Sequence, residues 1–251
     1  MIRFQGTLDR MRIKLFADGA DLEHIRKTCE NPHIRGITTN PTLMRQSGVE
    51  DYRSFAQDVL EAVPELPVCF EVLADDRMEM ARQARAIQSW GPNVFVKIPV
   101  TNTRGESSLP MVRSLVEDGV QVNITAVFTL DQVREAADVL AANVPGFVSI
   151  FAGRIADAGI DPVPVMTQAV EILGNLPQTE LIWASPREVF NVVQADACGC
   201  HVITLTDGLM SKLALIGKDL NEFSLETVKM FYDDALAAGY SSDSLVSGNA
   251  A

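Results

Sequence analysis

Short runs of apolar and β-branched residues recur along the chain at intervals of a few tens of residues. Each run is almost continuously apolar, which is typical of parallel strands that are buried on both faces. The sequence therefore predicts eight strands. They span Ile13–Ala17, Gly36–Thr39, Val68–Leu73, Val94–Pro99, Val120–Ala126, Phe147–Phe151, Leu181–Ser185 and Val202–Leu205.

The segments between these runs have apolar residues three and four positions apart, which is the spacing of an amphipathic helix. Thr129 and Asp161 precede two of these segments and are suitable helix caps. After Leu205 we expect a last barrel helix and then an additional helix over Ser224–Ala238. The other predicted helices are Glu50–Val63, Asp75–Trp90, Glu106–Asp118, Leu130–Ala142 and Pro162–Leu173.

This alternation of strands and helices predicts an α/β fold, the (β/α)8 TIM barrel, which uses about 250 residues as a single domain. The 251 residues fit one domain, with the barrel core over residues 12–220 and a C-terminal helix and tail over 221–251. The alternative is a doubly wound open sheet. It is disfavoured because no glycine-rich phosphate loop opens a helix after the first strand.

The chain is strongly acidic, with 21 Lys and Arg against 33 Asp and Glu and a net charge of −12. Such a charge repels polyanions, so we expect neither nucleic acid nor a membrane surface as a partner. No apolar stretch approaches the ~20 residues of a membrane span, and the first 16 residues lack the apolar core of a signal peptide. We therefore expect a cytoplasmic protein.

The cysteines and histidines do not predict a metal site. The four cysteines are irregularly placed, and Cys198, Cys200 and His201 lack the paired spacing of a structural zinc site. We interpret them as ordinary thiols and a histidine beside a short buried strand. His24 and His33 are expected at the surface or at helix ends.

Lys97 is the most unusual polar residue, because it lies inside a predicted strand with apolar neighbours on both sides, in a chain with only six lysines. Burial favours the neutral amine, which is the form that attacks a carbonyl to make a Schiff base. A lysine that snorkels from a strand end or pairs with a structural carboxylate would give the same pattern. On Lys97 alone the two interpretations have equal weight.

Polar residues at the ends of other predicted strands add to this evidence. In a TIM barrel the chemistry lies at the carboxyl ends of the strands, where these side chains would converge. Asp18 alone would more often be the N-cap of a following helix. Arg154 and Arg187 with Ser185 predict a pocket for a phosphate group. The other strand-end residues are Asn40, Glu71, Asn123, Thr125 and Ser149.

The same residues carry a resemblance to a known family. From about Ile13 to Leu220, the chain resembles the transaldolase family and its relatives, the fructose-6-phosphate aldolases. The length is similar to that of the short subfamily. The segments that carry the resemblance are FADGAD, GITTNP, FEVLA, NVFVKIP, VNITAVFT, SIFAGRI and WASPR.

The resemblance implies a role for each matching residue. Lys97 would form the Schiff base, and Asp18 would be the general acid and base at the sugar hydroxyl beside the breaking bond. Glu71 and Thr125 would hold a catalytic water. The remaining residues would bind substrate: Asn40, Asn123 and Ser149 the dihydroxyacetone hydroxyls with support from Thr38, and Arg154, Ser185 and Arg187 the distal phosphate.

Two positions distinguish transfer from plain aldol cleavage in the family that the chain resembles. Members that favour transfer tend to have Glu in the third strand and Phe in the sixth, and Glu71 and Phe151 stand there in this sequence. Transaldolase is therefore the first hypothesis, and an aldolase that releases free dihydroxyacetone is the alternative. Ile124, Ile150 and Pro186 depart from the familiar motifs. Pro186 is expected to bias Ser185 toward an extended backbone.

Other functions are less well supported. A sugar-phosphate-binding barrel would keep the fold with a structural Lys97, and a metal-dependent aldolase would need a histidine cluster at the strand ends. We expect no metal or cofactor, because the imine replaces a Lewis acid. The donor, the acceptor and the pathway, whether pentose phosphate or a specialised sugar synthesis, stay open. The resemblance also implies a ring-type homo-oligomer, such as a decamer, in which the C-terminal helix packs on a neighbouring copy. The alternative is that this helix packs on its own barrel.

Overall fold

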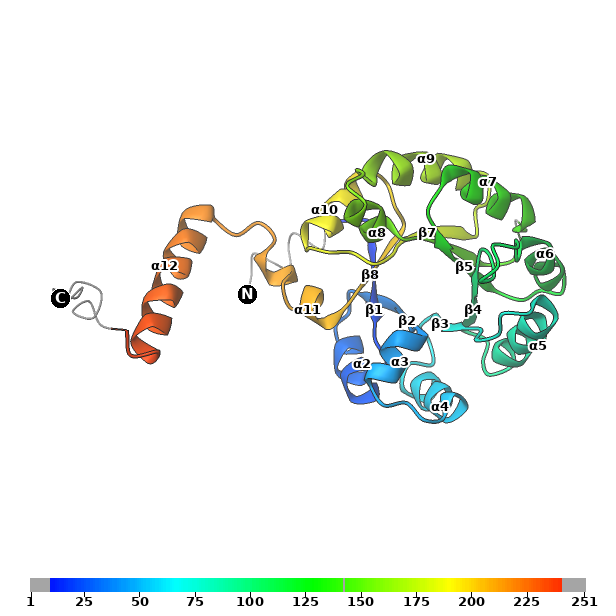
Figure 1. Ribbon diagram of the computed structural model, residues 1–251, viewed down its shortest axis with the longest axis horizontal. Helices are drawn as coiled ribbons and strands as arrows, with labels where there is room; N and C mark the ends of the chain where they lie inside the picture. Colours follow the sequence, from blue (N-terminus) through cyan, green and yellow to red (C-terminus); the bar gives the residue numbers. More distant parts are fainter. Residues whose placement is uncertain (1–9, 142, 241–251) are drawn as a thin grey trace, which may run out of the picture.

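The computed structural model describes residues 10–141 and 143–240, and their strands form one closed parallel barrel. The strands pair in chain order, and β8 pairs with β1 to close the sheet (Figure 1). The predicted TIM barrel is confirmed. The strands are β1 (Lys14–Asp18), β2 (Ile34–Thr38), β3 (Val68–Glu71), β4 (Val94–Pro99), β5 (Val122–Val127), β6 (Gly146–Ile150), β7 (Thr179–Trp183) and β8 (Val202–Leu205).

The barrel interior is filled by side chains, because alternate residues of each strand point inward and the opposite set faces the helices. Phe147 of β6 packs edge-on against Phe16 of β1, with ring centroids 5.5 Å apart, and lies 4.5 Å from the ring of Phe95. Cys69 of β3 and Ile182 of β7 belong to the same buried cluster. The outward set joins the larger core between sheet and helices.

Helices surround the barrel, and two of the predicted caps are present. Thr129 and Gln132 form a capping box at the start of α7, and Asp161 accepts a hydrogen bond from the Val163 N–H at the start of α9. The predicted end of the α7 segment, Ala142, lies outside the described residues. The helices before the C-terminal region are α2 (Leu22–Cys29), α3 (Pro41–Gln46), α4 (Tyr52–Ala62), α5 (Arg77–Gln88), α6 (Leu109–Glu117), α7 (Leu130–Val139), α8 (Ala152–Asp157), α9 (Val163–Leu173) and α10 (Phe190–Ala197).

The C-terminal region differs from its prediction. A short helix, α11 (Asp207–Met210), and a 3-10 turn over Leu213–Leu215 stand where a full barrel helix was expected. The additional helix α12 (Leu220–Ala237) begins earlier than predicted, because the Asp219 side chain caps it by accepting hydrogen bonds from the Asn221 and Glu222 N–H groups. The tail predicted beyond it, residues 241–251, lies outside the described part of the chain.

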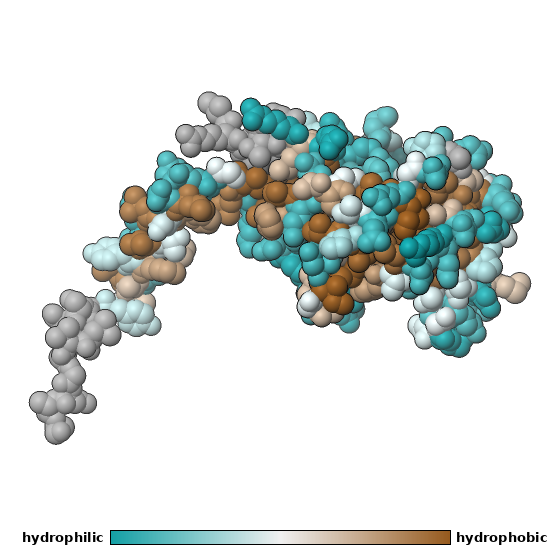
Figure 2. All heavy atoms as spheres, turned by 90° about the horizontal axis from the view of Figure 1, so that it is seen from above, coloured by the Kyte–Doolittle hydropathy of each residue, from teal (hydrophilic) through white to brown (hydrophobic). Residues whose placement is uncertain are grey.

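Helix α12 extends away from the barrel that precedes it (Figure 1). None of its residues is buried, and it does not pack on its own barrel. Brown, hydrophobic atoms show along this arm in Figure 2. The exposed large apolar residues of α12 are Leu220, Phe223, Leu225, Val228, Met230, Phe231, Tyr232 and Leu236. Among the described residues, no helix is both long enough and apolar enough to cross a membrane.

Candidate active site

A cavity of about 580 Å³ lies at the carboxyl ends of the strands, where a TIM barrel has its chemistry. Every site residue predicted from the sequence lines it except Asn123, which lies behind the wall. Residues of α3 and β8 complete the lining. The cavity is lined by Asp18, Thr38, Asn40, Pro41, Thr42, Leu43, Gln46, Glu71, Lys97, Thr125, Ser149, Phe151, Arg154, Ala184, Ser185, Arg187 and Thr204.

Lys97 lies deep in this cavity, with 7% of its surface exposed. Its register on β4 is directly opposite Glu71 of β3, and its Nζ lies 3.1 Å from Glu71 Oε2. Nζ also donates a hydrogen bond to the Thr39 carbonyl at 3.1 Å. The Lys97 amine and the Glu71 carboxylate therefore form a close pair inside the cavity. Such a pair places a proton acceptor beside an amine, which is the arrangement of an activated nucleophile.

Asp18 at the end of β1 lines the cavity and keeps part of its surface exposed. Desolvation of its carboxyl raises the pKa of this group despite the opposing charge of Lys97 and the hydrogen bond from Thr38. Thr38 Oγ1 donates to Asp18 Oδ1 at 2.8 Å, and Thr204 Oγ1 lies 2.5 Å from Thr38 Oγ1. Asp18 does not cap the following helix, as Asp21 accepts the capping bond from the His24 N–H of α2. A carboxyl with a raised pKa is suited to take up and release protons.

Asn40 and Thr125 have polar atoms available inside the cavity. Asn40 is the N-cap of α3, where its Oδ1 accepts a hydrogen bond from the Leu43 N–H, so its amide N–H groups remain for a ligand. Thr125 Oγ1 is buried and has no hydrogen-bond partner among the described residues. A buried hydroxyl is normally hydrogen-bonded, so this atom is suited to a water or a substrate oxygen.

Asn123 reaches the cavity only through Ser149. The Ser149 hydroxyl donates to Asn123 Oδ1 at 2.7 Å, and Asn123 Nδ2 donates to Cys69 Sγ at 3.3 Å. Asn123 and Cys69 are fully buried, whereas Ser149 lines the cavity. Asn123 therefore lies one residue behind the cavity surface, and its role toward a substrate hydroxyl stays a prediction.

The two arginines at the mouth differ in their surroundings. Arg187 binds the Asp157 carboxylate through Nε and Nη2, and its Nη1 donates to Ser185 Oγ at 3.0 Å. These hydrogen bonds lower the pKa of Asp157. Arg154 lies over the Phe151 ring, 5.5 Å from its centroid, and its guanidinium has no hydrogen bond or ion pair with any described residue. Arg154 is therefore the more available of the two for an anionic ligand.

The backbone of Ser185 differs from its prediction. An extended conformation was expected before Pro186, but Ser185 has a φ of 60°, in the left-handed region. The expectation was wrong because tertiary contacts override the local preference. Helix α8 begins against this turn, and a Cβ at Gly153 would lie 1.6 Å from the Ser185 carbonyl oxygen. The strained backbone holds Ser185 Oγ within reach of Arg187.

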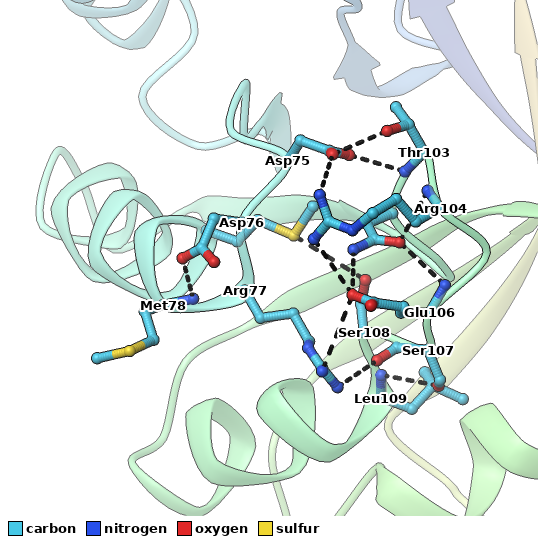
Figure 3. Close-up of polar contacts among 12 residues, drawn as sticks. Asp75, Asp76, Arg77, Met78, Thr103, Arg104, Glu106, Ser107, Ser108 and Leu109 are labelled. Carbon is cyan, nitrogen blue, oxygen red and sulfur yellow. Dashed lines mark hydrogen bonds and ion pairs between the residues drawn. The ribbon is translucent and has the colours of Figure 1, made fainter.

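A network of polar side chains joins the loops that follow β3 and β4 (Figure 3). Asp75 accepts hydrogen bonds from the N–H and the hydroxyl of Thr103 at 2.7 and 2.8 Å, and Arg104 bridges Asp75 and Glu106. The Thr103 bonds lower the pKa of Asp75. These loops follow the strands that carry Glu71 and Lys97, so the network ties the two strand ends together.

Sequence reasoning missed several residues of this region. Thr204 reads as an ordinary strand residue, and Asp157 as a solvated helix residue. Cys69 was assessed only as a free thiol. Gly153 follows Phe151 in a helix that is too short to show a periodic pattern. In each case the partner is distant in the sequence, so no local pattern could indicate the contact.

Within the described residues, no group of three or more His, Cys, Asp or Glu side chains could hold a metal ion. The Cys200 thiol donates to the Leu181 and Val202 carbonyls, and His201 Nδ1 accepts a hydrogen bond from the Leu181 N–H. These contacts attach the start of β8 to β7.

A family model described as "Transaldolase/Fructose-6-phosphate aldolase" matches residues 15–247. The chain belongs to this family. It is 37% identical over 194 residues to a protein of Dehalococcoides mccartyi named "Probable transaldolase", covering 77% of this chain and 86% of the relative. It is 32% identical over 216 residues to a protein of the same name from Herpetosiphon aurantiacus, covering 86% and 92%.

The fold of this family member is also similar to that of a solved structure with low sequence identity. A crystal structure of 2,3-dimethylmalate lyase superposes with a TM-score of 0.54 at 14% sequence identity, covering 95% of this chain and 88% of the other. At that identity the similarity concerns the fold alone.

Proposed function

We propose that this protein is a transaldolase that works through a Schiff base on Lys97. It would transfer a dihydroxyacetone unit from a ketose phosphate, fructose 6-phosphate or sedoheptulose 7-phosphate, to an aldose phosphate. The observation that carries the proposal is a buried amine 3.1 Å from one carboxylate, Glu71, in a cavity that also holds a second carboxylate, Asp18. This combination supplies a nucleophile and two groups that exchange protons.

The steps follow from these positions. Glu71 takes a proton from Lys97, whose free amine attacks the ketone, and loss of water gives a protonated imine. The imine accepts electrons when the C3–C4 bond breaks, as Asp18 takes the proton of the C4 hydroxyl. The aldose phosphate leaves, and the three-carbon enamine adds to an acceptor while Asp18 returns the proton. Water then hydrolyses the new imine, which releases the product ketose and regenerates the Lys97 amine. A water between Glu71 and Thr125, whose hydroxyl lacks a partner among the described residues, would relay protons.

The arginines would bind the distal phosphate at the mouth. Arg154 offers a guanidinium without a hydrogen-bonded partner, and Arg187 offers one that a phosphate must share with Asp157. Binding of this remote group positions the reacting carbons and so accelerates the chemical step. The proposed mechanism needs no metal or cofactor.

Borohydride reduction tests the proposal. With fructose 6-phosphate and sodium borohydride, we expect a permanent three-carbon adduct on Lys97, located by peptide mass spectrometry. Lys97→Arg keeps the positive charge and should give neither adduct nor turnover. A Lys97→Arg protein as active as the parent would contradict the mechanism, and inhibition of the parent by EDTA would favour a metal-dependent reaction.

An aldolase that releases free dihydroxyacetone is the second candidate, because both activities appear in the name of the family. Phe151 favours transfer. Its ring lines the cavity and carries no hydroxyl that could protonate the enamine, so an acceptor aldehyde has time to react.

We also propose a homo-oligomer, in which α12 packs on a neighbouring copy. The exposed apolar residues of α12 support this assembly, because a contiguous apolar surface on a helix is typical of a protein–protein interface. A ring such as a decamer, the cytoplasmic location, and the exclusion of nucleic acid and membranes stay predictions from the sequence.

A further inference from the structure

Three buried side chains form a hydrogen-bonded chain behind the cavity wall. Ser149 of β6 donates to Asn123 of β5 at 2.7 Å, and Asn123 donates to Cys69 of β3 at 3.3 Å. Cys69 and Asn123 are 0% exposed and Ser149 is 2% exposed. Only Ser149 lines the cavity, so Cys69 can act on a ligand only through the other two.

The direction of these bonds determines what Ser149 offers to a ligand. A serine hydroxyl has one proton and two lone pairs. Because the proton of Ser149 is donated to Asn123 Oδ1, its oxygen presents only lone pairs to the cavity. Ser149 therefore accepts a hydrogen bond from a ligand, and the ligand group that it selects is a hydroxyl that donates.

Cys69 maintains this direction. Its surroundings are the aromatic and aliphatic side chains of the barrel interior, among them Phe16, Phe95 and Phe147, and burial raises the pKa of its thiol to about 11. The sulfur is therefore a neutral partner for Asn123 Nδ2 in an apolar environment. Without it, the buried Asn123 amide would lose the partner that fixes its orientation, which is costly.

We propose that Cys69 is a positioning residue that, through Asn123, fixes Ser149 as an acceptor for a hydroxyl of the donor ketose. The proposal rests on the proposed function. It deepens that function by explaining how the site would prefer a hydroxylated ketone, such as dihydroxyacetone, over an unsubstituted one.

The test compares two ketones in borohydride trapping at Lys97: dihydroxyacetone, which carries hydroxyls, and acetone, which carries none. We expect Cys69→Val to lower the ratio of the two trapping rates about tenfold, the effect of one unsatisfied buried hydrogen bond. Cys69→Ser restores a group that accepts a hydrogen bond and should keep the ratio within about twofold of the parent.

Two further variants separate positioning from general damage to the fold. Cys200→Val removes another buried thiol, whose bonds go to backbone carbonyls away from the cavity, and should leave the ratio unchanged. Ser149→Ala should lower the ratio as Cys69→Val does. Because the residues would act as one chain, the double variant should lower it no further than Ser149→Ala alone.

The outcomes are distinguishable. If Cys69→Val slows trapping of both ketones equally, or if its effect adds to that of Ser149→Ala, Cys69 has only a structural role and the proposal is wrong. If the parent forms no adduct with either ketone, the Schiff-base function is wrong and the role assigned to Cys69 in it is overturned as well.

Discussion

At the residue scale, Asp18 combines its proposed role in proton transfer with a cost to stability. Burial raises the pKa of its carboxyl, so the ionised form is disfavoured in the folded protein. A raised pKa stabilises the fold at low pH, below the value of the unfolded chain, and this stabilisation is lost as the pH rises through the folded value. At neutral pH, where an aspartate of the unfolded chain is ionised, the raised pKa of Asp18 therefore lowers the free energy of unfolding.

We expect Asp18→Asn to unfold at a higher temperature than the parent at pH 7, while turnover is lost. The difference in melting temperature should shrink as the pH approaches about 4, the value for a free aspartate. Thermal unfolding over this pH range measures it. Asp58→Asn, at an exposed position of α4, is the control and should show no comparable gain. If Asp18→Asn were less stable than the parent at pH 7, the hydrogen bond between Thr38 and Asp18 would stabilise the fold by more than the burial of the carboxylate destabilises it.

Phe151→Tyr should raise aldol cleavage relative to transfer, because the new hydroxyl can protonate the enamine before an acceptor arrives. The measurement is the ratio of free dihydroxyacetone to transfer product with a fixed acceptor. Phe128→Tyr is a matched control, because the Phe128 ring lies 5.8 Å from Phe151 but is not part of the cavity lining. An unchanged ratio in Phe151→Tyr would remove the argument for transfer.

At the scale of elements, α8 lies close against the turn that follows β7, where the Gly153 N–H donates to the Ala184 carbonyl at 3.3 Å. Gly153→Ala would place a Cβ 1.6 Å from the Ser185 carbonyl oxygen, a backbone atom that cannot move without displacing the turn. We expect a loss of about 2–4 kcal/mol in the free energy of unfolding, as for other overpacked sites. Urea unfolding measures it.

Gly208→Ala is the matched control, because nothing lies within 4 Å of a Cβ at that position of α11. Its effect should stay within about 0.5 kcal/mol. If Gly153→Ala lowered the free energy of unfolding as little as Gly208→Ala, the contact between α8 and the Ser185 turn would not be what positions Ser185 and Arg187.

How far the sequence predicts each element depends on where its stabilising contacts come from. Strands β4 and β8 match the predicted Val94–Pro99 and Val202–Leu205, because an apolar run between polar or turn residues marks both ends. Helix α8, over Ala152–Asp157, is too short for a periodic pattern and was not predicted. The left-handed Ser185 depends on Gly153, which belongs to another strand–helix unit.

The site follows the same rule. Strand-end positions brought all but one of the predicted residues to the cavity, because parallel strands of a barrel deliver their carboxyl ends to one side. The partners of those residues were not predictable. The pairing of Arg187 with Asp157, and of Asn123 with Cys69, joins residues on different elements whose side-chain directions only the folded chain determines.

At the scale of the whole molecule, α12 is a helix of 18 residues none of which is buried. We expect a chain that ends at Lys218 to lose the assembled state of the parent, measured by light scattering after size-exclusion chromatography. Turnover per chain should persist, because every residue that lines the cavity lies between Asp18 and Thr204.

A point variant avoids the effects of truncation. Val228→Lys places a charge among the exposed apolar residues of α12 and should dissociate the assembly in the same way, whereas Asp233→Lys changes a polar position of the same helix and should not. A parent protein that is monomeric at all concentrations would exclude the proposed packing.

The two carboxylates around Lys97 have a consequence for the energy profile of catalysis. An amine that takes up a proton and an amine that becomes a protonated imine carry the same single positive charge at nearly the same point. In the proposed mechanism Glu71 and Asp18 would therefore need no rearrangement when the covalent intermediate forms, because the field that suits a protonated amine also suits the iminium. On this view the barrel is preorganised for its intermediate before any sugar arrives.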